Sequence, residues 1–321
     1  MNNKEIKETL QELTDSCIGI EVFFVDHEDN LYRSDIKNGH MDDARKAFVK
    51  ATKSKYVTNE QMTTPFLSQY DDRKHALYIF DFDNKPVAFG LVDKVLKLSP
   101  EDKKKTIPEY QTKDNKLSGI KAVILVLKDK KGKKYGFYQH VFNVTLLKSE
   151  SGILNLTTHQ TRVIKLDSDI LRVSPNFVFM KVNDTYLIEN VTALESQLNF
   201  KTVIHQRAEL YTEELIEKNF ADNFDIFLEK AQEDTSFARK IVKVCRHSAV
   251  LEQHIDTQTL IDFVTKEDDY FSVLKLTENG DKFDLNSINR CRKFLELLDD
   301  DFLRSPLTKK SYIARAKDRV N

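Results

Sequence analysis

Residues 120–127 read Ile-Lys-Ala-Val-Ile-Leu-Val-Leu, a run of mostly branched apolar side chains and the clearest structural signal in the chain. Branched and aromatic residues favour β-strands. A lysine-rich turn that contains Gly132 follows at residues 128–134, and apolar and aromatic residues then continue through residues 135–147. The pattern predicts a long β-hairpin with a lysine-rich tip.

Further strand signals lie on both sides of this hairpin, within the first 189 residues. We expect helices at residues 3–14 and 41–52, and strands at residues 18–25, 76–82, 86–92, 161–166, 177–182 and 185–188. Sheet therefore dominates this part of the chain. The sequence predicts a β-rich mixed N-terminal domain that spans residues 1–189.

The period of the apolar pattern changes after Asn190, because Val191, Leu194 and Leu198 recur at intervals of three to four residues. We expect helices at residues 224–232, 236–249, 257–266 and 285–298, and a short hairpin around residues 278–281. The predicted fold class is therefore α+β. A mainly helical C-terminal domain with a short hairpin and a basic tail is expected over residues 190–321.

The composition fits a protein that folds on its own, since 40% of its 321 residues are hydrophobic, including 21 Phe and 11 Tyr. No window approaches the roughly 18 uninterrupted apolar residues of a membrane span, and the first 14 residues are polar rather than signal-like. Cys17, Cys245 and Cys291 are odd in number and far apart, which suits a reducing compartment. We expect a cytoplasmic protein with free thiols.

The sequence carries no assembled catalytic or cofactor motif. No pair of glycines stands in a phosphate-binding register, and neither GxSxG nor HExxH occurs. Cys245 and His247 lie two residues apart on a predicted helix and would point to different faces, which disfavours a zinc site. We expect no cofactor and no metal, and favour binding over catalysis. Asp81 and Asp83, at a strand end, leave open a metal-dependent nuclease with a dispersed carboxylate site.

Two basic stretches contrast with the net charge of −1 of the whole chain. Residues 103–134 hold eleven lysines against three acidic residues, and five of these lysines crowd the predicted hairpin tip: Lys128, Lys130, Lys131, Lys133 and Lys134. The tail from Arg304 to Asn321 has six basic residues against Asp318 alone, with Tyr312 among them. Its candidate phosphate contacts are Lys309, Lys310, Arg315 and Lys317.

The helical half is less favourable to a polyanion, because residues 190–300 hold 22 acidic and 14 basic side chains. The predicted helix at residues 236–249 is an exception. Its basic residues are spaced by three and four positions, which places several on one face, and they are the candidate contacts of this region: Arg239, Lys240, Lys243 and Arg246. Binding of a polyanion is therefore expected to use selected edges.

Residues 292–312 read Arg-Lys-Phe-Leu-Glu-Leu-Leu-Asp-Asp-Asp-Phe-Leu-Arg-Ser-Pro-Leu-Thr-Lys-Lys-Ser-Tyr, and Lys317 follows. This stretch resembles the C-terminal signature of KwaB-like proteins of the bacterial Kiwa anti-phage system. The order of a β-rich half and a helical half is similar to that family over most of the chain. The resemblance implies a cytoplasmic DNA-binding effector without a known catalytic centre. It also implies association with a KwaA-like membrane protein and restraint of phage replication and transcription.

The residues and the resemblance together predict a homodimer that binds DNA largely without sequence specificity and is recruited to the inner membrane by its partner. No small-molecule substrate is expected. Two alternatives stay open. One is the metal-dependent nuclease, and the other is a protein-docking module that binds no nucleic acid.

Overall fold

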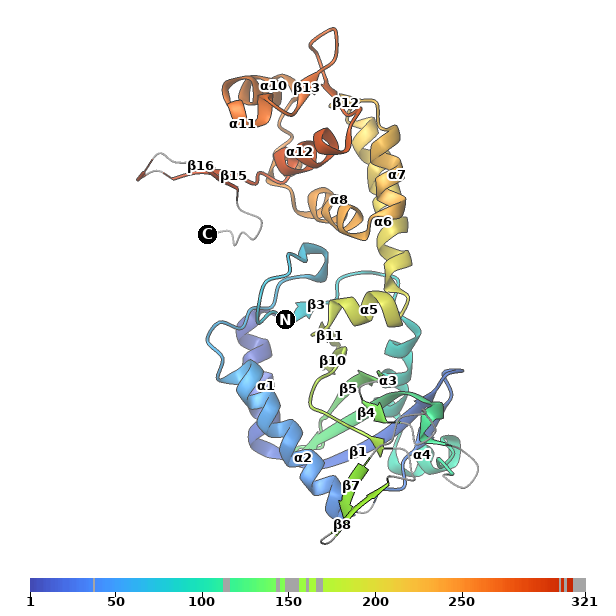
Figure 1. Cartoon of the computed structure of the whole chain (residues 1–321). Helices are drawn as coiled ribbons and strands as arrows, with labels where there is room; N and C mark the ends of the chain where they lie inside the picture. Colours follow the sequence, from blue (N-terminus) through green and yellow to red (C-terminus); the bar gives the residue numbers. More distant parts are fainter. Residues whose placement is uncertain are drawn as a thin grey trace. The chain divides into compact units, whose positions relative to one another are not determined.

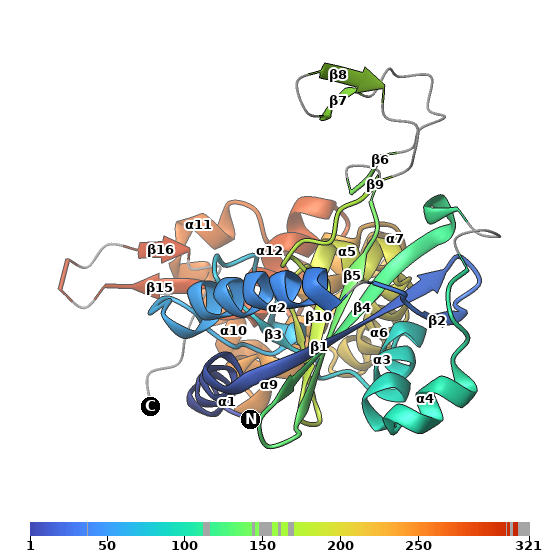
Figure 2. The same cartoon turned by 90° about the horizontal axis from the view of Figure 1, so that it is seen from below.

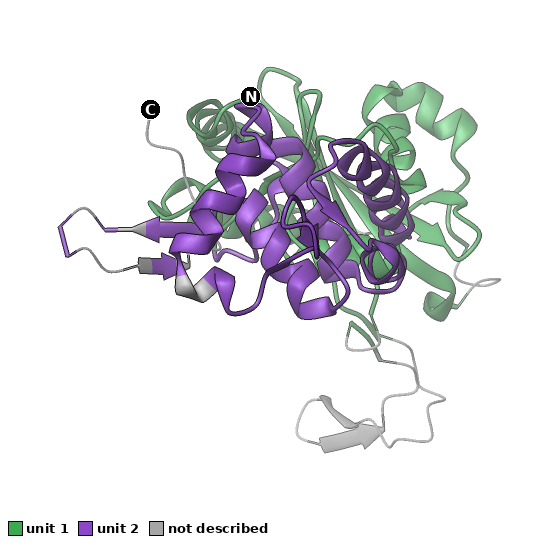
Figure 3. Cartoon of the chain, turned by 90° about the horizontal axis from the view of Figure 1, so that it is seen from above, with its two compact units in different colours: residues 1–65, 75–198 green, residues 66–74, 199–321 purple. Residues whose placement is uncertain are grey.

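The computed structural model describes residues 1–36, 38–111, 116–142, 145–147, 156–159, 162–165, 170–305, 307–308 and 311–313. The chain forms two compact units (Figure 3). Unit 1 comprises residues 1–65 and 75–198, and unit 2 comprises residues 66–74 and 199–321. The short segment 66–74 thus belongs to unit 2 although the chain on both sides of it belongs to unit 1.

Unit 1 is built on a seven-stranded sheet in the order β2-β1-β4-β5-β10-β11-β3, in which all neighbours are antiparallel. Its strands are β1 (Cys17–Asp26), β2 (Leu31–Arg33), β3 (Tyr78–Ile79), β4 (Ile120–Asp129), β5 (Lys134–His140), β10 (Phe179–Val182) and β11 (Thr185–Ile188). The predicted hairpin is confirmed as the pair β4–β5, although β5 ends at His140 rather than at residue 147.

Helices cover both faces of this sheet. Figure 1 shows α1 (Asn3–Ser16) and α2 (Asn38–Thr52) on one side, and α3 (Val87–Lys97) and α4 (Pro100–Thr106) on the other. Successive side chains of a strand point to opposite faces. Val123 and Leu125 of β4 therefore join the core beneath α1 and α2, where α2 crosses the strands (Figure 2). Ile124 and Val126 face α3 and α4.

Coverage on both faces explains the apolar run that opens β4, because a strand buried on both sides needs apolar residues at every position. Of its ten residues, only Lys121 and Lys128 are not buried. Gly136 of β5, directly across from Val126, allows α3 to approach closely. A Cβ atom at this glycine would lie 2.5 Å from Cγ1 of Val92.

The predicted strand at residues 86–92 is wrong, because these residues begin the helix α3. Over a short window, an apolar run is compatible with either structure. The helical period becomes clear only when the pattern is followed to Val95, since the buried positions are Ala88, Phe89, Val92 and Val95. Pro86, whose φ of −56° suits the start of a helix, precedes the first turn.

Unit 2 is mainly helical, with α6 (Phe200–Glu217), α7 (Asp225–Glu233), α8 (Thr235–His247), α9 (Ala249–Glu252), α10 (Thr257–Lys266), α11 (Asp268–Phe271) and α12 (Ile288–Leu298). A small sheet joins β12 (Ala221–Asp222), β14 (Phe283–Asp284) and β13 (Lys275–Leu276), and β15 (Phe302–Arg304) pairs with β16 (Ser311–Ile313). Gly280, with φ of +73°, lies in the predicted turn between β13 and β14. The α+β class, with the large sheet in the N-terminal half, is confirmed.

The remaining elements are short. Unit 1 also contains α5 (Val191–Gln197), a π-helix at Lys53–Val57, a 3-10 helix at Leu117–Gly119, and the strand pairs β6 (Leu146–Leu147) with β9 (Ile170–Leu171) and β7 (Leu156–His159) with β8 (Arg162–Lys165). A 3-10 helix at Leu67–Gln69 belongs to unit 2. Among the helices of the described residues, none has both the length and the apolar character needed to cross a bilayer.

The contact of Gly136 with α3 gives a prediction for stability. Changing Gly136→Ala should lower the free energy of unfolding by about 1–3 kcal/mol, because the added methyl group overpacks against Val92, which is fully buried. Gly90→Ala on the exposed side of α3 is the control, since nothing lies within 4 Å of its Cβ position. It should stabilise by about 0.5–1 kcal/mol through helix propensity. Urea denaturation of the wild type and both variants measures these changes. Equal denaturation midpoints for Gly136→Ala and the wild type would contradict this packing.

Candidate nucleic-acid interface

The tip of the β4–β5 hairpin is held by its own backbone and by one buried carboxylate. Asp129 is fully buried, and its Oδ1 accepts a hydrogen bond from the backbone N–H of Lys133 at 2.8 Å. Gly132, with φ of +84°, donates to the carbonyl of Asp129, and the N–H of Lys130 donates to the carbonyl of Ser16. The lysine side chains therefore extend from a turn whose backbone is fixed.

The five lysines of this tip do not share one face. Lys128 and Lys134 are direct cross-strand partners on the face covered by α3 and α4. Lys134 is half-buried there, and its Nζ donates to the carbonyls of Leu96 at 3.1 Å and Leu98 at 2.9 Å, at the end of α3. Burial lowers the pKa of Lys134, and the charges of Lys103 and Lys128 lower it further.

Two other lysines of the tip turn towards the opposite face. Lys131 forms an ion pair with Glu12 of α1. The Nζ of Lys133 lies 5.4 Å from the ring centroid of Tyr135, whose side chain belongs to the core under α1 and α2. Lys130 is exposed. The structure thus divides by face a set of residues that the sequence could only group by position.

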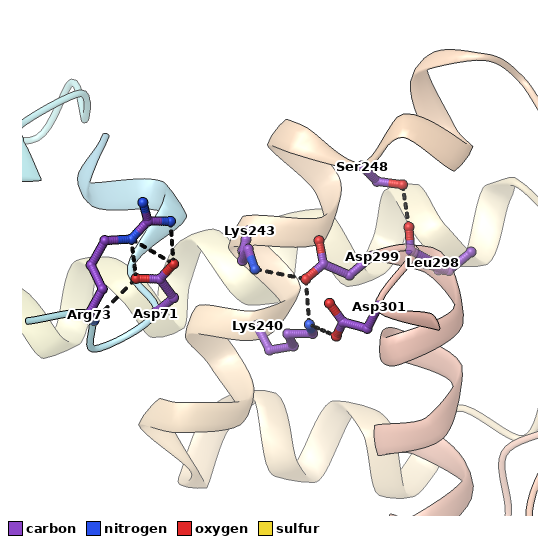
Figure 4. A network of polar contacts seen from close by, with 8 residues as sticks. All are labelled: Asp71, Arg73, Lys240, Lys243, Ser248, Leu298, Asp299 and Asp301. Carbon is purple, nitrogen blue, oxygen red and sulfur yellow. Dashed lines mark hydrogen bonds and ion pairs between the residues drawn. The ribbon is translucent and has the colours of Figure 1, made fainter. Parts of the chain in front are cut away.

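The candidate residues of α8 lie in a different setting, shown in Figure 4. The Nζ of Lys240 pairs with both Asp299 and Asp301, and that of Lys243 lies 2.9 Å from Asp299. The two carboxylates are nearly buried, with 5% and 2% of their side chains exposed. These ion pairs tie α8 to the turn that leads from α12 into β15. The charges of both lysines are therefore engaged inside unit 2.

The protonation of Asp299 follows from this pairing. Burial alone would raise the pKa of its carboxyl group, but Lys240 and Lys243 together outweigh burial and hold the pKa below its usual value. Ser248, which follows α8, donates its hydroxyl proton to the carbonyl of Leu298 at the end of α12. The end of α12 is therefore anchored to α8 by charge and by a hydrogen bond.

The other two basic residues of α8 are Arg239, which is half-buried, and Arg246, which is exposed. The guanidinium of Arg239 lies 5.0 Å from the ring centroid of Tyr70, and Arg246 is exposed in the last turn. Arg246 also lines a polar pocket of about 840 Å³ in unit 2. Side chains of both signs line this pocket, among them Asp71, Arg73, Glu214, Lys218, Lys243, Glu252 and Asp299. Its mixed charge does not favour a polyanion.

The tail candidates Lys309, Lys310, Arg315 and Lys317 lie outside the described residues. The strands that surround part of this stretch are described, and Leu303 of β15 lies directly across from Tyr312 of β16. Their exposed fractions are 42% and 53%. The preceding residue of β15, Phe302, is not exposed in this way, because its ring packs against those of Phe263 and Tyr270.

The residues weighed for metal chemistry belong to different units. Asp81 and Asp83 lie between β3 and α3. Burial raises the pKa of the Cys245 thiol to about 12, so the thiolate needed for zinc is strongly disfavoured. The Nε2 of His247 lies 2.7 Å from the hydroxyl of Ser68. Within the described ranges, no three or more His, Cys, Asp or Glu side chains are grouped so that they could hold a metal ion.

Four further exposed lysines near the hairpin are not among the contacts predicted from the sequence. Lys94 and Lys97 lie on α3, and Lys104 and Lys105 lie on α4. Lys104 and Lys105 belong to the basic stretch of residues 103–134, but lie outside the hairpin tip to which the predicted contacts of that stretch are confined. Lys94 and Lys97 could have been found from their three-residue spacing if the helix had been recognised.

The ion pairs of Lys240 give a prediction for stability. Changing Lys240→Met should cost about 3–5 kcal/mol of unfolding free energy, because it leaves two nearly buried carboxylates without this cation. Lys230→Met is the control, since its partners Glu229 and Glu233 are exposed and their loss should change little. Chemical denaturation of both variants provides the comparison.

The ion pair between Lys240 and Asp299 also predicts that stability depends on pH. The folded-state pKa of Asp299 lies below its unfolded value, so its contribution to stability is complete above pH of about 4 and is lost as pH falls through the folded pKa. The stability difference between Lys240→Met and the wild type should therefore narrow in acid. A difference that stays constant from pH 7 to pH 3 would contradict the ion pair.

Comparisons with known proteins agree with the C-terminal signature. Residues 117–308 match the family model described as Kiwa protein KwaB-like. The chain is also 30% identical over 322 residues to Kiwa protein KwaB of Escherichia coli O55:H7 (strain RM12579 / EPEC), with 100% of both chains covered. No solved structure matches it. The chain therefore belongs to the KwaB-like family of the Kiwa system.

Proposed function

We propose that this protein acts in Kiwa defence by binding DNA through its lysine side chains, largely without sequence specificity. Membership of the KwaB-like family implies a role in the Kiwa system. The single observation that carries the DNA proposal is the fixed hairpin tip, from which Lys128, Lys130 and Lys131 extend into solvent. Lysine ammonium groups pair with phosphates and carry no information about base sequence, so such a surface binds DNA of any sequence.

The other candidate contacts support this proposal unequally. Arg246 is exposed in the last turn of α8, whereas Lys240 and Lys243 are engaged by the nearly buried Asp299. The tail residues are proposed contacts on the strength of their charge: Lys309, Lys310, Arg315 and Lys317. A cytoplasmic homodimer would double this modest basic surface. A KwaA-like membrane protein is the proposed partner, and restraint of phage replication and transcription is the proposed outcome.

A second candidate function is protein docking without nucleic acid. It is favoured by the apolar side chains exposed on and near the β15–β16 pair. Leu307 is 89% exposed, and Leu303 and Tyr312 lie across from each other with about half of each side chain in solvent. Isolated apolar side chains are common on surfaces, so this observation weighs less than the lysine-rich tip.

A salt series tests the proposal. Binding of the purified protein to a labelled duplex should weaken steeply as salt rises, with a slope of roughly 0.9 log units per log unit of salt for each phosphate contact. The double variant Lys128→Glu with Lys130→Glu should bind more weakly and with a smaller slope. The matched control reverses two exposed lysines of unit 2, Lys201→Glu with Lys266→Glu, and should bind as the wild type does.

The assay is run with and without Mg²⁺, and the length of the duplex is checked afterwards. Binding that is sensitive to salt and leaves the DNA intact supports the DNA-binding proposal. Cleavage of the duplex that requires Mg²⁺ would instead support the metal-dependent nuclease. A folded protein that binds no duplex at low salt would overturn the proposal and favour protein docking.

A further inference from the structure

We propose that the DNA lies along the α3/α4 side of unit 1, where α3 and α4 supply phosphate contacts in addition to the hairpin. The contacts are Lys94, Lys97, Lys104, Lys105 and Lys128. Lys134, by contrast, is a positioning residue that holds the hairpin to α3. This inference rests on the proposed function and assigns the face on which binding occurs.

The alternation of side chains along the strands places these residues on one side. Val126 pairs with Glu21 of β1 and with Gly136 of β5, so the three positions share a face. Gly136 contacts α3, and Glu21 forms an ion pair with Lys103 of α4. Lys128 stands two residues beyond Val126 and therefore lies on this same face.

The helix α3 presents its lysines outward. Its buried residues recur at helical spacing and pack on the sheet, whereas Gly90, Lys94 and Lys97 lie on the exposed stripe. Both lysines stand in the last turn, where the negative end of the helix dipole favours cations. The packing that buries one side of α3 thus fixes the direction of its charged side.

The helix α4 divides its three consecutive lysines in the same way. Lys103 is only 3% exposed, pairs with Glu21, and lies 5.1 Å above the ring centroid of Phe23. This contact anchors α4 to the sheet. Lys104 and Lys105 are exposed as a consequence. A buried lysine therefore orients two that are free to reach a ligand.

Charge also separates the two sides of unit 1. On the α3/α4 side, Lys103 offsets Glu21 and Lys181 offsets Asp93. Within α3 and α4, Glu101 and Asp102 are the remaining acidic residues, and the exposed lysines on this side are Lys94, Lys97, Lys104, Lys105 and Lys128. Within the described contacts, these lysines form no ion pair.

Helix α1 is a poorer partner for DNA than α3 or α4. Helix α1 carries the acidic residues Glu5, Glu8, Glu12 and Asp15 against Lys4 and Lys7. Glu12 also engages Lys131 of the hairpin tip. A polyanion approaching this side would meet a net negative helix and would have to break an ion pair. The electrostatic balance therefore favours α3 and α4 over α1 as partners for DNA.

Lys134 has a different role despite its position in the lysine-rich tip. Its Nζ donates to two carbonyls at the C-terminal end of α3, and it is half-buried against that helix. Terminal carbonyls of a helix need such donors. Lys134 therefore satisfies carbonyl groups at the end of α3 and holds the hairpin beside the last turn of that helix.

The experiment measures duplex affinity by fluorescence anisotropy at several salt concentrations, with the full chain. The test variant changes Lys94, Lys97, Lys104 and Lys105 to Gln. The slope of log affinity against log salt should fall by about 0.9 for each contact removed, and affinity should fall at least about tenfold. The pairs Lys94/Lys97 and Lys104/Lys105 are also changed separately, so that each helix is tested alone.

The matched control removes the same charge from the opposite side of unit 1, by changing Lys4, Lys46, Lys50 and Lys53 to Gln. All four are exposed on or beside α1 and α2. The slope and affinity of this control should remain close to those of the wild type. Circular dichroism confirms that every variant is folded.

Lys134→Met separates positioning from contact. It should lower the thermal midpoint because the carbonyls of Leu96 and Leu98 lose their donor, yet leave the salt slope unchanged. A slope that falls by about 0.9 would instead make Lys134 a phosphate contact and overturn this part of the inference.

The outcomes test the assigned face separately from DNA binding itself. A wild type that binds no duplex refutes the proposed function. A wild type that binds with a steep salt slope, together with an α3/α4 variant of the same slope, leaves DNA binding in place and refutes the assigned face. Equal losses in the test and control variants would likewise refute it, because binding would then follow total charge.

Discussion

Burial of β4 on both faces is the constraint on which unit 1 depends. A strand covered by helices on both sides places its accessible charges near its ends, and β4 does so at Lys121, at Lys128 and in the turn that follows. The close approach of α3 at Gly136 belongs to the same arrangement. Packing therefore decides which lysines reach solvent and on which side they do so.

The same residue type serves opposite purposes in this chain. Lys103 and Lys134 are turned inward in unit 1, where one pairs with Glu21 and the other satisfies the end of α3. In unit 2, Lys240 and Lys243 neutralise nearly buried aspartates. Such lysines stabilise the fold and are poorly placed to bind phosphate. A count of basic residues therefore overstates the surface that a polyanion meets.

The sequence predicts the fold where the apolar pattern is long and the site only in part. The β4–β5 hairpin and helices α8, α10 and α12 could be predicted because each carries its period over many residues. The strand expected at residues 86–92 failed because that window was too short to separate helix from strand. Prediction of the candidate site from the sequence was limited for a different reason. The division of Lys128 from Lys131 depends on α1 and α3, which are distant in sequence, and no local pattern contains that information.

Lysine footprinting can show whether the α3/α4 side of unit 1 contacts the DNA. The protein is acetylated briefly with and without a saturating duplex, and modification at each lysine is read by mass spectrometry. We expect the duplex to protect Lys94, Lys97 and Lys104, and we expect Lys4 and Lys46 on α1 and α2 to be modified equally in both samples. Protection confined to the α1 and α2 lysines, with those of α3 and α4 unchanged, would contradict it.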